Sequence, residues 1–163
     1  MRALMIAAAI LCAAAAPLFD APRAFAQDTT AQPTPIEAEK VNECALAFLK
    51  ALRQKDVGEA MLHADVPFIA EDAKILKTEG ELRDYLTKML AAQQDDSVLP
   101  NAVFGVLDYG GSRGATAEEA RALRDQVLTK ADYLVGIGRD GFSRGVLLVK
   151  AKAGEPVVVG IGY

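Results

Sequence analysis

Apolar residues recur every three or four positions between residues 36 and 52, which is the spacing of one face of an α-helix. They are Val41, Cys44, Ala45, Phe48, Leu49 and Leu52. Thr34 and Pro35 stand just before this stretch and Glu37 is placed to close a capping box, so a helix start is expected there. The pattern predicts a long amphipathic helix that ends near Gln54.

Two further helices are expected after this one. Asp56 would cap a short helix that ends before the next proline, because the residue before a proline is disfavoured in the helical conformation. Residues 68–69 and 74–77 are expected as two short extended pieces. Residues 78–81 repeat the capping box and predict a third helix that ends at residues 93–97.

From Ala102 onward the pattern favours strands. Strands are predicted at residues 102–109, 131–138, 142–152 and 157–163. Residues 110–114 would form a flexible loop, and a fourth helix capped by Thr116 would continue to Leu128. Short turns join the last three strands, so these strands would form an antiparallel meander. Helices first and strands last predict an α+β fold.

The faces of the last three strands do not alternate cleanly with charge. In the first of them, for example, Tyr133 and Val135 point to one side while Leu134 and Gly136 point to the other. Both faces of the sheet are therefore expected to be at least partly covered. Helices would cover one face, and the other would be a pocket wall or a subunit interface.

The N-terminus is typical of an export signal. Arg2 precedes an apolar stretch at residues 3–18, and Ala24 and Ala26 supply the small residues that a signal peptidase requires. Residues 1–26 are expected to be removed between Ala26 and Gln27, with residues 27–35 as a flexible linker and residues 36–163 as a single domain. The mature protein would then be secreted or periplasmic, with no membrane span.

Charge and cysteine content narrow the function classes. The net charge is −4 and no lysine or arginine cluster is present, so nucleic acid is not an expected partner. Removal of Cys12 with the signal would leave Cys44 alone, and a single thiol forms no internal disulfide. Cys44 lies among the apolar positions of the first helix and is expected to be a small buried hydrophobe.

The layout resembles the nuclear transport factor 2-like (SnoaL-like) superfamily. The resemblance rests on the helix at residues 36–52, the segment at residues 64–68, the helix entry at residues 77–82 and the final strand at residues 158–161. It implies a cone-like bent antiparallel sheet wrapped around a long N-terminal helix. The superfamily contains isomerases, dehydratases, ligand-binding proteins and dimerisation modules, so the fold alone does not determine the function.

His63, Asp65 and Asp72 are the candidate acid-base residues. A buried aspartate has a raised pKa and can exchange protons near neutral pH, with histidine as a partner. The simpler interpretation is a histidine at a helix end and two aspartates in solvated turns. A metal site is not expected, because His63 is the single histidine of the chain and no second thiol would help it after cleavage.

Two glycine-rich motifs have weak functional interpretations. Residues 141–145 match the G-x-S-x-G nucleophile elbow, but a strand follows the serine instead of a helix and no histidine lies downstream. Residues 110–114 precede a helix but lack the lysine of a phosphate-binding loop. Neither motif predicts catalysis.

The sequence favours a non-catalytic module that binds a small apolar ligand or forms a homodimer through its sheet, without a cofactor. The residues expected to line an apolar cavity are Phe48, Phe68, Tyr85, Met89 and Tyr133. Two alternatives stay open. One is an isomerase or dehydratase that uses a pocket aspartate, and the other is a module that binds an envelope protein.

Overall fold

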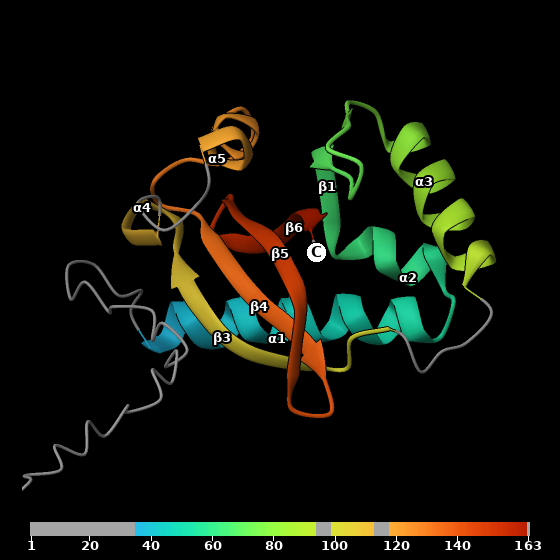
Figure 1. The fold of residues 1–163 in the computed structure, drawn as a ribbon, viewed down its shortest axis with the longest axis horizontal. Helices are drawn as coiled ribbons and strands as arrows, with labels where there is room; N and C mark the ends of the chain where they lie inside the picture. Colours follow the sequence, from blue (N-terminus) through green and yellow to red (C-terminus); the bar gives the residue numbers. More distant parts are fainter. Residues whose placement is uncertain (1–34, 94–98, 113–117, 163) are drawn as a thin grey trace, which may run out of the picture.

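A computed structural model describes residues 35–93, 99–112 and 118–162 (Figure 1). The predicted signal segment and its cleavage site at Ala26 and Gln27 lie outside the described residues, as does most of the linker. Among the described residues, no helix is both long and apolar enough to cross a membrane.

The three predicted N-terminal helices are confirmed. They are α1 (Pro35–Arg53), α2 (Val57–Leu62) and α3 (Glu79–Ala92). The Asp56 side chain caps α2 by accepting a hydrogen bond from the Glu59 backbone N–H at 2.9 Å. Thr78 and Glu81 form the predicted capping box of α3, in which each side chain accepts a hydrogen bond from the other residue's backbone N–H.

Six strands form one open sheet in the order β2-β1-β6-β5-β4-β3. They are β1 (Ala64–Ile69), β2 (Ile75–Leu76), β3 (Ala102–Asp108), β4 (Tyr133–Arg139), β5 (Phe142–Lys152) and β6 (Glu155–Gly162). Strands β4 to β6 form the predicted antiparallel meander, and β3 pairs antiparallel with β4. Both hairpin turns have two residues with positive φ, which matches the right-handed twist of the strands.

The sheet is mixed instead of wholly antiparallel. Strand β1 pairs with β6 in parallel, with Ala64 opposite Val158 and Ile69 opposite Gly160. Strand β1 also begins four residues earlier than the extended piece predicted at residue 68. The expected α+β fold, with a sheet packed against a long first helix, is confirmed.

The region between β3 and β4 differs from the prediction. Residues 109–112 form a helical turn, α4 (Tyr109–Ser112), instead of a loop, and the Asp108 carboxylate holds it by accepting a hydrogen bond from the Gly111 N–H at 2.7 Å. Helix α5 (Glu118–Arg124) ends four residues before Leu128. The chain turns there because Val127 and Leu128 are buried against the sheet. The expected N-cap of this helix, Thr116, lies outside the described residues.

Two hydrophobic clusters occupy opposite faces of the sheet. On the inner face, alternate residues of β4 and β5 such as Val135 and Leu147 pack against α1, while α3 packs on β1 and β2. On the outer face, the intervening residues Leu134 and Leu148 pack against residues from the α5 side, such as Leu128. Figure 1 shows α1 along one side of the sheet and α5 at the opposite end of the molecule.

Candidate functional site

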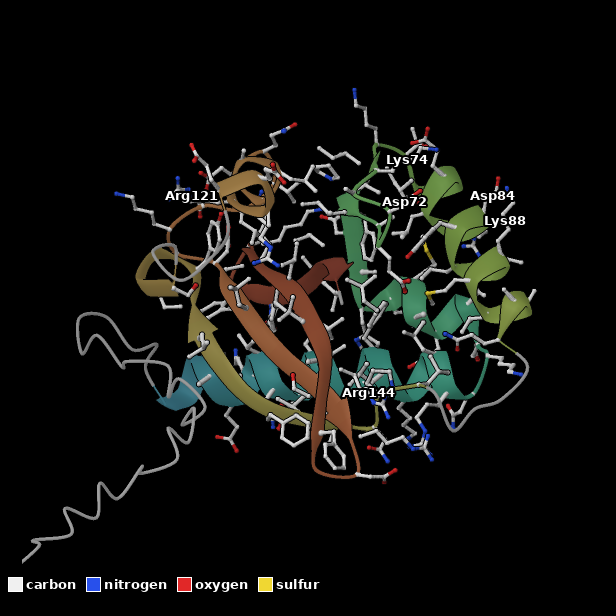
Figure 2. All side chains as sticks on the ribbon, in the orientation of Figure 1. Asp72, Lys74, Asp84, Lys88, Arg121 and Arg144 are labelled. Atoms are coloured by element: carbon white, nitrogen blue, oxygen red, sulfur yellow. The ribbon has the colours of Figure 1, made fainter. Side chains whose placement is uncertain are left out.

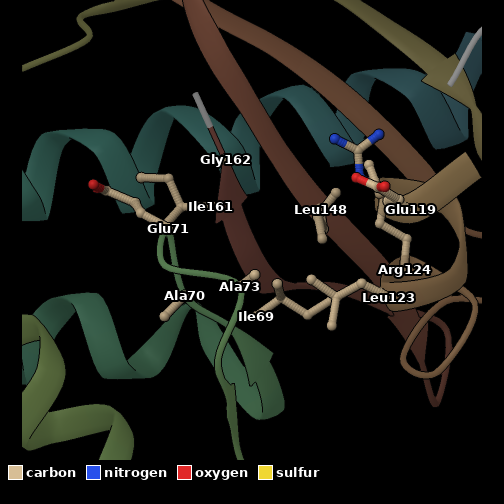
Figure 3. A pocket seen from close by; sticks show the side chains of 11 residues that line it. Ile69, Ala70, Glu71, Ala73, Glu119, Leu123, Arg124, Leu148, Ile161 and Gly162 are labelled. Carbon is tan, nitrogen blue, oxygen red and sulfur yellow. The ribbon is translucent and has the colours of Figure 1, made fainter. Parts of the chain in front are cut away.

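A cleft of about 320 Å³ lies on the α5 side of the sheet (Figure 3). Its volume is at the lower end of the range of small-ligand sites. Its walls come from the end of β1 and the turn that follows it, from the middle of β5, from the end of β6, and from α5. The lining residues are mostly apolar or small: Ile69, Ala70, Glu71, Ala73, Glu119, Ala120, Leu123, Arg124, Leu148, Ile161 and Gly162.

The cleft arises from the way β1 ends. Ile69 is the last residue of β1 and lies opposite Gly160, so β6 continues past the end of its parallel neighbour. The chain then turns tightly, with the Ala73 N–H donating to the Ala70 carbonyl at 3.0 Å. Because Ala70 and Ala73 have small side chains, this turn leaves space beside the end of β6.

Arg124 supplies the positive charge of the cleft. Its side chain is partly buried, and it forms no hydrogen bond or ion pair with any residue in the described part of the chain. Burial lowers the pKa of the Arg124 guanidinium, while the nearby Tyr109 hydroxyl acts in the opposite direction. An arginine stays protonated at neutral pH even so, and the cleft therefore contains a cation that is not paired with any described side chain.

Glu71 lies at the other end of the same cleft. Figure 3 shows its carboxylate pointing away from Arg124. Its backbone N–H donates to the Tyr85 hydroxyl at 3.3 Å, which fixes the turn to α3. Burial raises the pKa of the Glu71 carboxyl, and the adjacent Asp72 charge raises it further.

The three predicted acid-base residues do not meet in one site. His63 Nε2 lies 3.6 Å from the Glu59 carboxylate, and Asp65 forms an ion pair with Lys152. Asp72 accepts a hydrogen bond from the Lys74 backbone N–H at 3.3 Å, as a turn aspartate does. None of the three lines the cleft beside Arg124.

The five predicted ligand-binding residues belong to the inner core. Phe48, Phe68 and Tyr133 are buried there, and Tyr85 and Met89 pack against them. The Phe68 and Tyr85 rings lie 6.1 Å apart at a tilt of 48°. Burial raises the pKa of Tyr85 to about 12, so its hydroxyl stays protonated. These residues fill the space between α1, α3 and the sheet.

A second hollow of about 240 Å³ lies between the β1–β2 connection and α3. Tyr85 and Asp72 line it, together with the alternating charges of Lys74, Asp84 and Lys88 (Figure 2). Exposed charges of both signs are well solvated and bind each other weakly. This hollow therefore has less capacity to hold an apolar ligand than the cleft beside Arg124.

The other candidate motifs have structural roles. Ser143 is exposed on β5, directly after a hairpin turn, where it cannot act as a nucleophile elbow. Cys44 is buried and its thiol lies 3.2 Å from the Pro156 carbonyl oxygen. Burial raises the pKa of the Cys44 thiol to about 11, which makes it unreactive at neutral pH. No cluster of metal-ligating side chains is found in the described ranges.

Sequence reasoning missed Arg124, although a signal was present. Ala120, Leu123, Arg124 and Val127 follow the i, i+3, i+4, i+7 spacing of one helix face. An arginine in an otherwise apolar stripe indicates a charge held at a buried surface. The location of the opposite wall, in the turn after β1, has no comparable signal in the sequence.

The fold and the cleft define an α+β domain in which a mixed sheet packs on a long first helix and an arginine lies in an apolar cleft. Comparison of the chain with models of protein families, with curated proteins and with solved structures gives no match.

Proposed function

We propose that this chain is an exported, non-catalytic binding module of the nuclear transport factor 2-like type. It holds a small ligand in the cleft between α5 and the end of β6, and it forms a homodimer through the outer face of its sheet. The observation that carries the binding function is the cleft itself: it has mostly apolar walls, and none of His63, Asp65 and Asp72 is among the residues that line it.

Ligand binding is tested by titrating the purified protein with 1-octanol, a neutral apolar probe, and following backbone amide shifts by NMR. We expect the largest shifts at Leu148, Ile161 and Gly162. Ala120→Phe would fill the cleft from α5 and abolish these shifts. Ala122→Phe is the matched control, because Ala122 is exposed on the same helix and does not line the cleft. Equal binding by both variants would refute the assignment of the cleft.

Dimerisation is supported by apolar side chains exposed on the outer face. Phe104 is 49% exposed and Leu107 is 45% exposed, and Phe142 at the adjacent hairpin is 71% exposed. The Phe104 ring covers Gly138 so closely that a Cβ at that position would lie 2.4 Å from Phe104 Cε2. The result is an apolar surface of neighbouring strands that a second copy would cover.

Sedimentation tests the dimer. We expect the wild-type protein to sediment as a dimer and Leu107→Glu to sediment as a monomer, because the substitution buries a charge in the interface. Leu62→Glu is the control, since Leu62 is 73% exposed on α2, away from this surface. A wild-type monomer at high concentration would remove the dimer from the proposal.

Export is tested separately from binding. Expression of the full chain in a bacterial host, followed by N-terminal sequencing of the periplasmic and secreted fractions, is expected to give a mature chain that begins at Gln27. Recovery of the uncleaved chain from the cytoplasm would refute this part of the proposal.

A further inference from the structure

The position of Arg124 gives the cleft a chemical preference that its apolar walls alone would not have. A charge that leaves water incurs a desolvation cost unless an opposite charge or hydrogen-bonding groups replace the water. The side chain of Arg124 is partly buried on the apolar stripe of α5 and makes no ion pair or hydrogen bond with the residues of the described ranges. A ligand can supply the missing anion.

We propose that the cleft selects small monocarboxylates with an apolar chain: the carboxylate pairs with Arg124 and the chain lies on Ile69, Leu148 and Leu123. This inference rests on the proposed ligand-binding function and specifies the class of ligand. The planar guanidinium can donate two parallel hydrogen bonds to a carboxylate, a geometry that fixes the orientation of the ligand.

The apolar floor lies beside the charge. Figure 3 shows Leu148 and Leu123 between the Arg124 side chain and the turn that contains Ala70 and Ala73. An anion bound at the guanidinium thus has apolar side chains along one direction only, toward the end of β6. This arrangement suits an amphipathic ligand with its charge at one end.

The lining also contains two carboxylates. Glu119 is exposed on α5 and forms no ion pair with Arg124, so water screens it. Glu71 is likewise exposed and points away from Arg124. A second negative charge at the far end of a ligand would have to leave water against the apolar lining, and Arg124, at the other end, could not pair with it. The cleft therefore favours a monoanion over a dianion of the same length.

Calorimetric titration tests this preference with three probes of equal chain length: octanoate, neutral 1-octanol and the dianion octanedioate. We expect octanoate to bind the wild-type protein most tightly. In Arg124→Met, which keeps an apolar side chain and removes the charge, the Kd of octanoate should rise about tenfold or more. The Kd of 1-octanol should not rise.

Arg121→Met is the matched control, because it removes the same charge from the same helix at a residue that does not line the cleft. Its Kd for octanoate should stay within about twofold of the wild-type value, since Arg121 is not among the residues that would contact the carboxylate. Arg124→Lys keeps the charge but not the planar fork, so its Kd should lie between those of the wild type and Arg124→Met. Unchanged amide spectra verify that each variant is folded.

The outcomes separate this inference from the proposed function. If 1-octanol and octanoate bind equally and Arg124→Met changes neither Kd, the carboxylate preference is refuted while ligand binding stands. If octanedioate binds as tightly as octanoate, the monoanion preference is refuted. If no probe binds, both the inference and the binding function are refuted.

Discussion

The two faces of the sheet use the same kind of strand for different purposes. On the inner face, α1 packs along the sheet and α3 packs on β1 and β2, and Phe48, Val135 and Leu147 are fully buried. On the outer face, α5 covers only part of the sheet and leaves both a cleft and exposed Phe104 and Leu107. The inner face therefore contributes most of the buried apolar core, while the outer face leaves apolar side chains accessible.

Truncation of a phenylalanine on each face should give the largest difference in the free energy of unfolding. Phe48→Ala removes a fully buried ring and is expected to lower the free energy of unfolding by about 3–5 kcal/mol. Phe142→Ala removes a ring that is 71% exposed and should change stability by less than about 0.5 kcal/mol in the monomer. Urea denaturation measures both. Similar losses would show that the two faces contribute equally.

The reactivity of thiols tests whether the inner face is closed to reagents. The raised pKa of Cys44, about 11, leaves little thiolate at pH 8, and packing blocks access to it. We expect Cys44 to react with iodoacetamide at least about a hundredfold more slowly than an ordinary exposed thiol. A cysteine introduced by Ala120→Cys, in the cleft, should react readily. Mass spectrometry of the folded protein should then show one adduct per chain, and rapid labelling of Cys44 would contradict a closed inner face.

Substitution of Asp132 tests which hydrogen bonds hold the segment before β4 in place. It is 2% exposed and accepts hydrogen bonds from the Thr129 N–H at 2.6 Å, the Thr129 hydroxyl at 2.9 Å and the Ala151 N–H at 3.0 Å. Asp132→Asn replaces one acceptor oxygen by a donor, so a loss of about 1–3 kcal/mol is expected in thermal or urea unfolding. Asp140→Asn, in an exposed hairpin turn, should have almost no effect. Equal losses of stability in Asp132→Asn and Asp140→Asn would show that the buried hydrogen bonds of Asp132 contribute nothing specific.

The pH dependence of stability should give the smallest effect. Burial raises the pKa of Glu71 in the folded state, so its ionisation costs folding free energy as the pH rises through its ordinary pKa toward the raised value. Glu71→Gln should leave stability unchanged at acidic pH and increase it at neutral pH, by less than about 1 kcal/mol because solvent screens the group.

Glu81→Gln should change the stability in the opposite direction from Glu71→Gln. Hydrogen bonds from the Lys77 and Thr78 backbone N–H groups lower the pKa of Glu81. Its contribution to stability is therefore present above its ordinary pKa and lost as the pH falls toward the lowered value. Unfolding measured across this pH range should show the two variants deviating from the wild type in opposite directions. Deviations of the same sign would contradict the assigned causes.

The helices could be predicted because their signals are local. The capping residues Asp56 and Thr78 and the apolar spacing of α1 depend only on neighbours within two turns of helix. The two hairpins of the meander were predictable for the same reason, since their turns identify adjacent strands.

The remaining features depend on contacts between distant residues. The parallel pairing of β1 with β6 joins residues about ninety positions apart. The sequence of an apolar strand contains no local signal that identifies the strand with which it pairs. The helical turn α4 depends on Asp108 accepting a hydrogen bond three residues later, a choice that glycine-rich sequence leaves open. The candidate site was missed for a related reason: Arg124 and the turn after Ile69 meet only when the sheet has formed.

The placement of β6 has a consequence for how the chain acquires its structure. This strand is central, with β1 on one side and β5 on the other, yet it is the last strand to be synthesised, after residue 154. Until it emerges, β1 lacks its parallel neighbour, and the inner cluster lacks Val158 and Ile161. The inner face of the sheet is therefore expected to close only once this last strand has been synthesised.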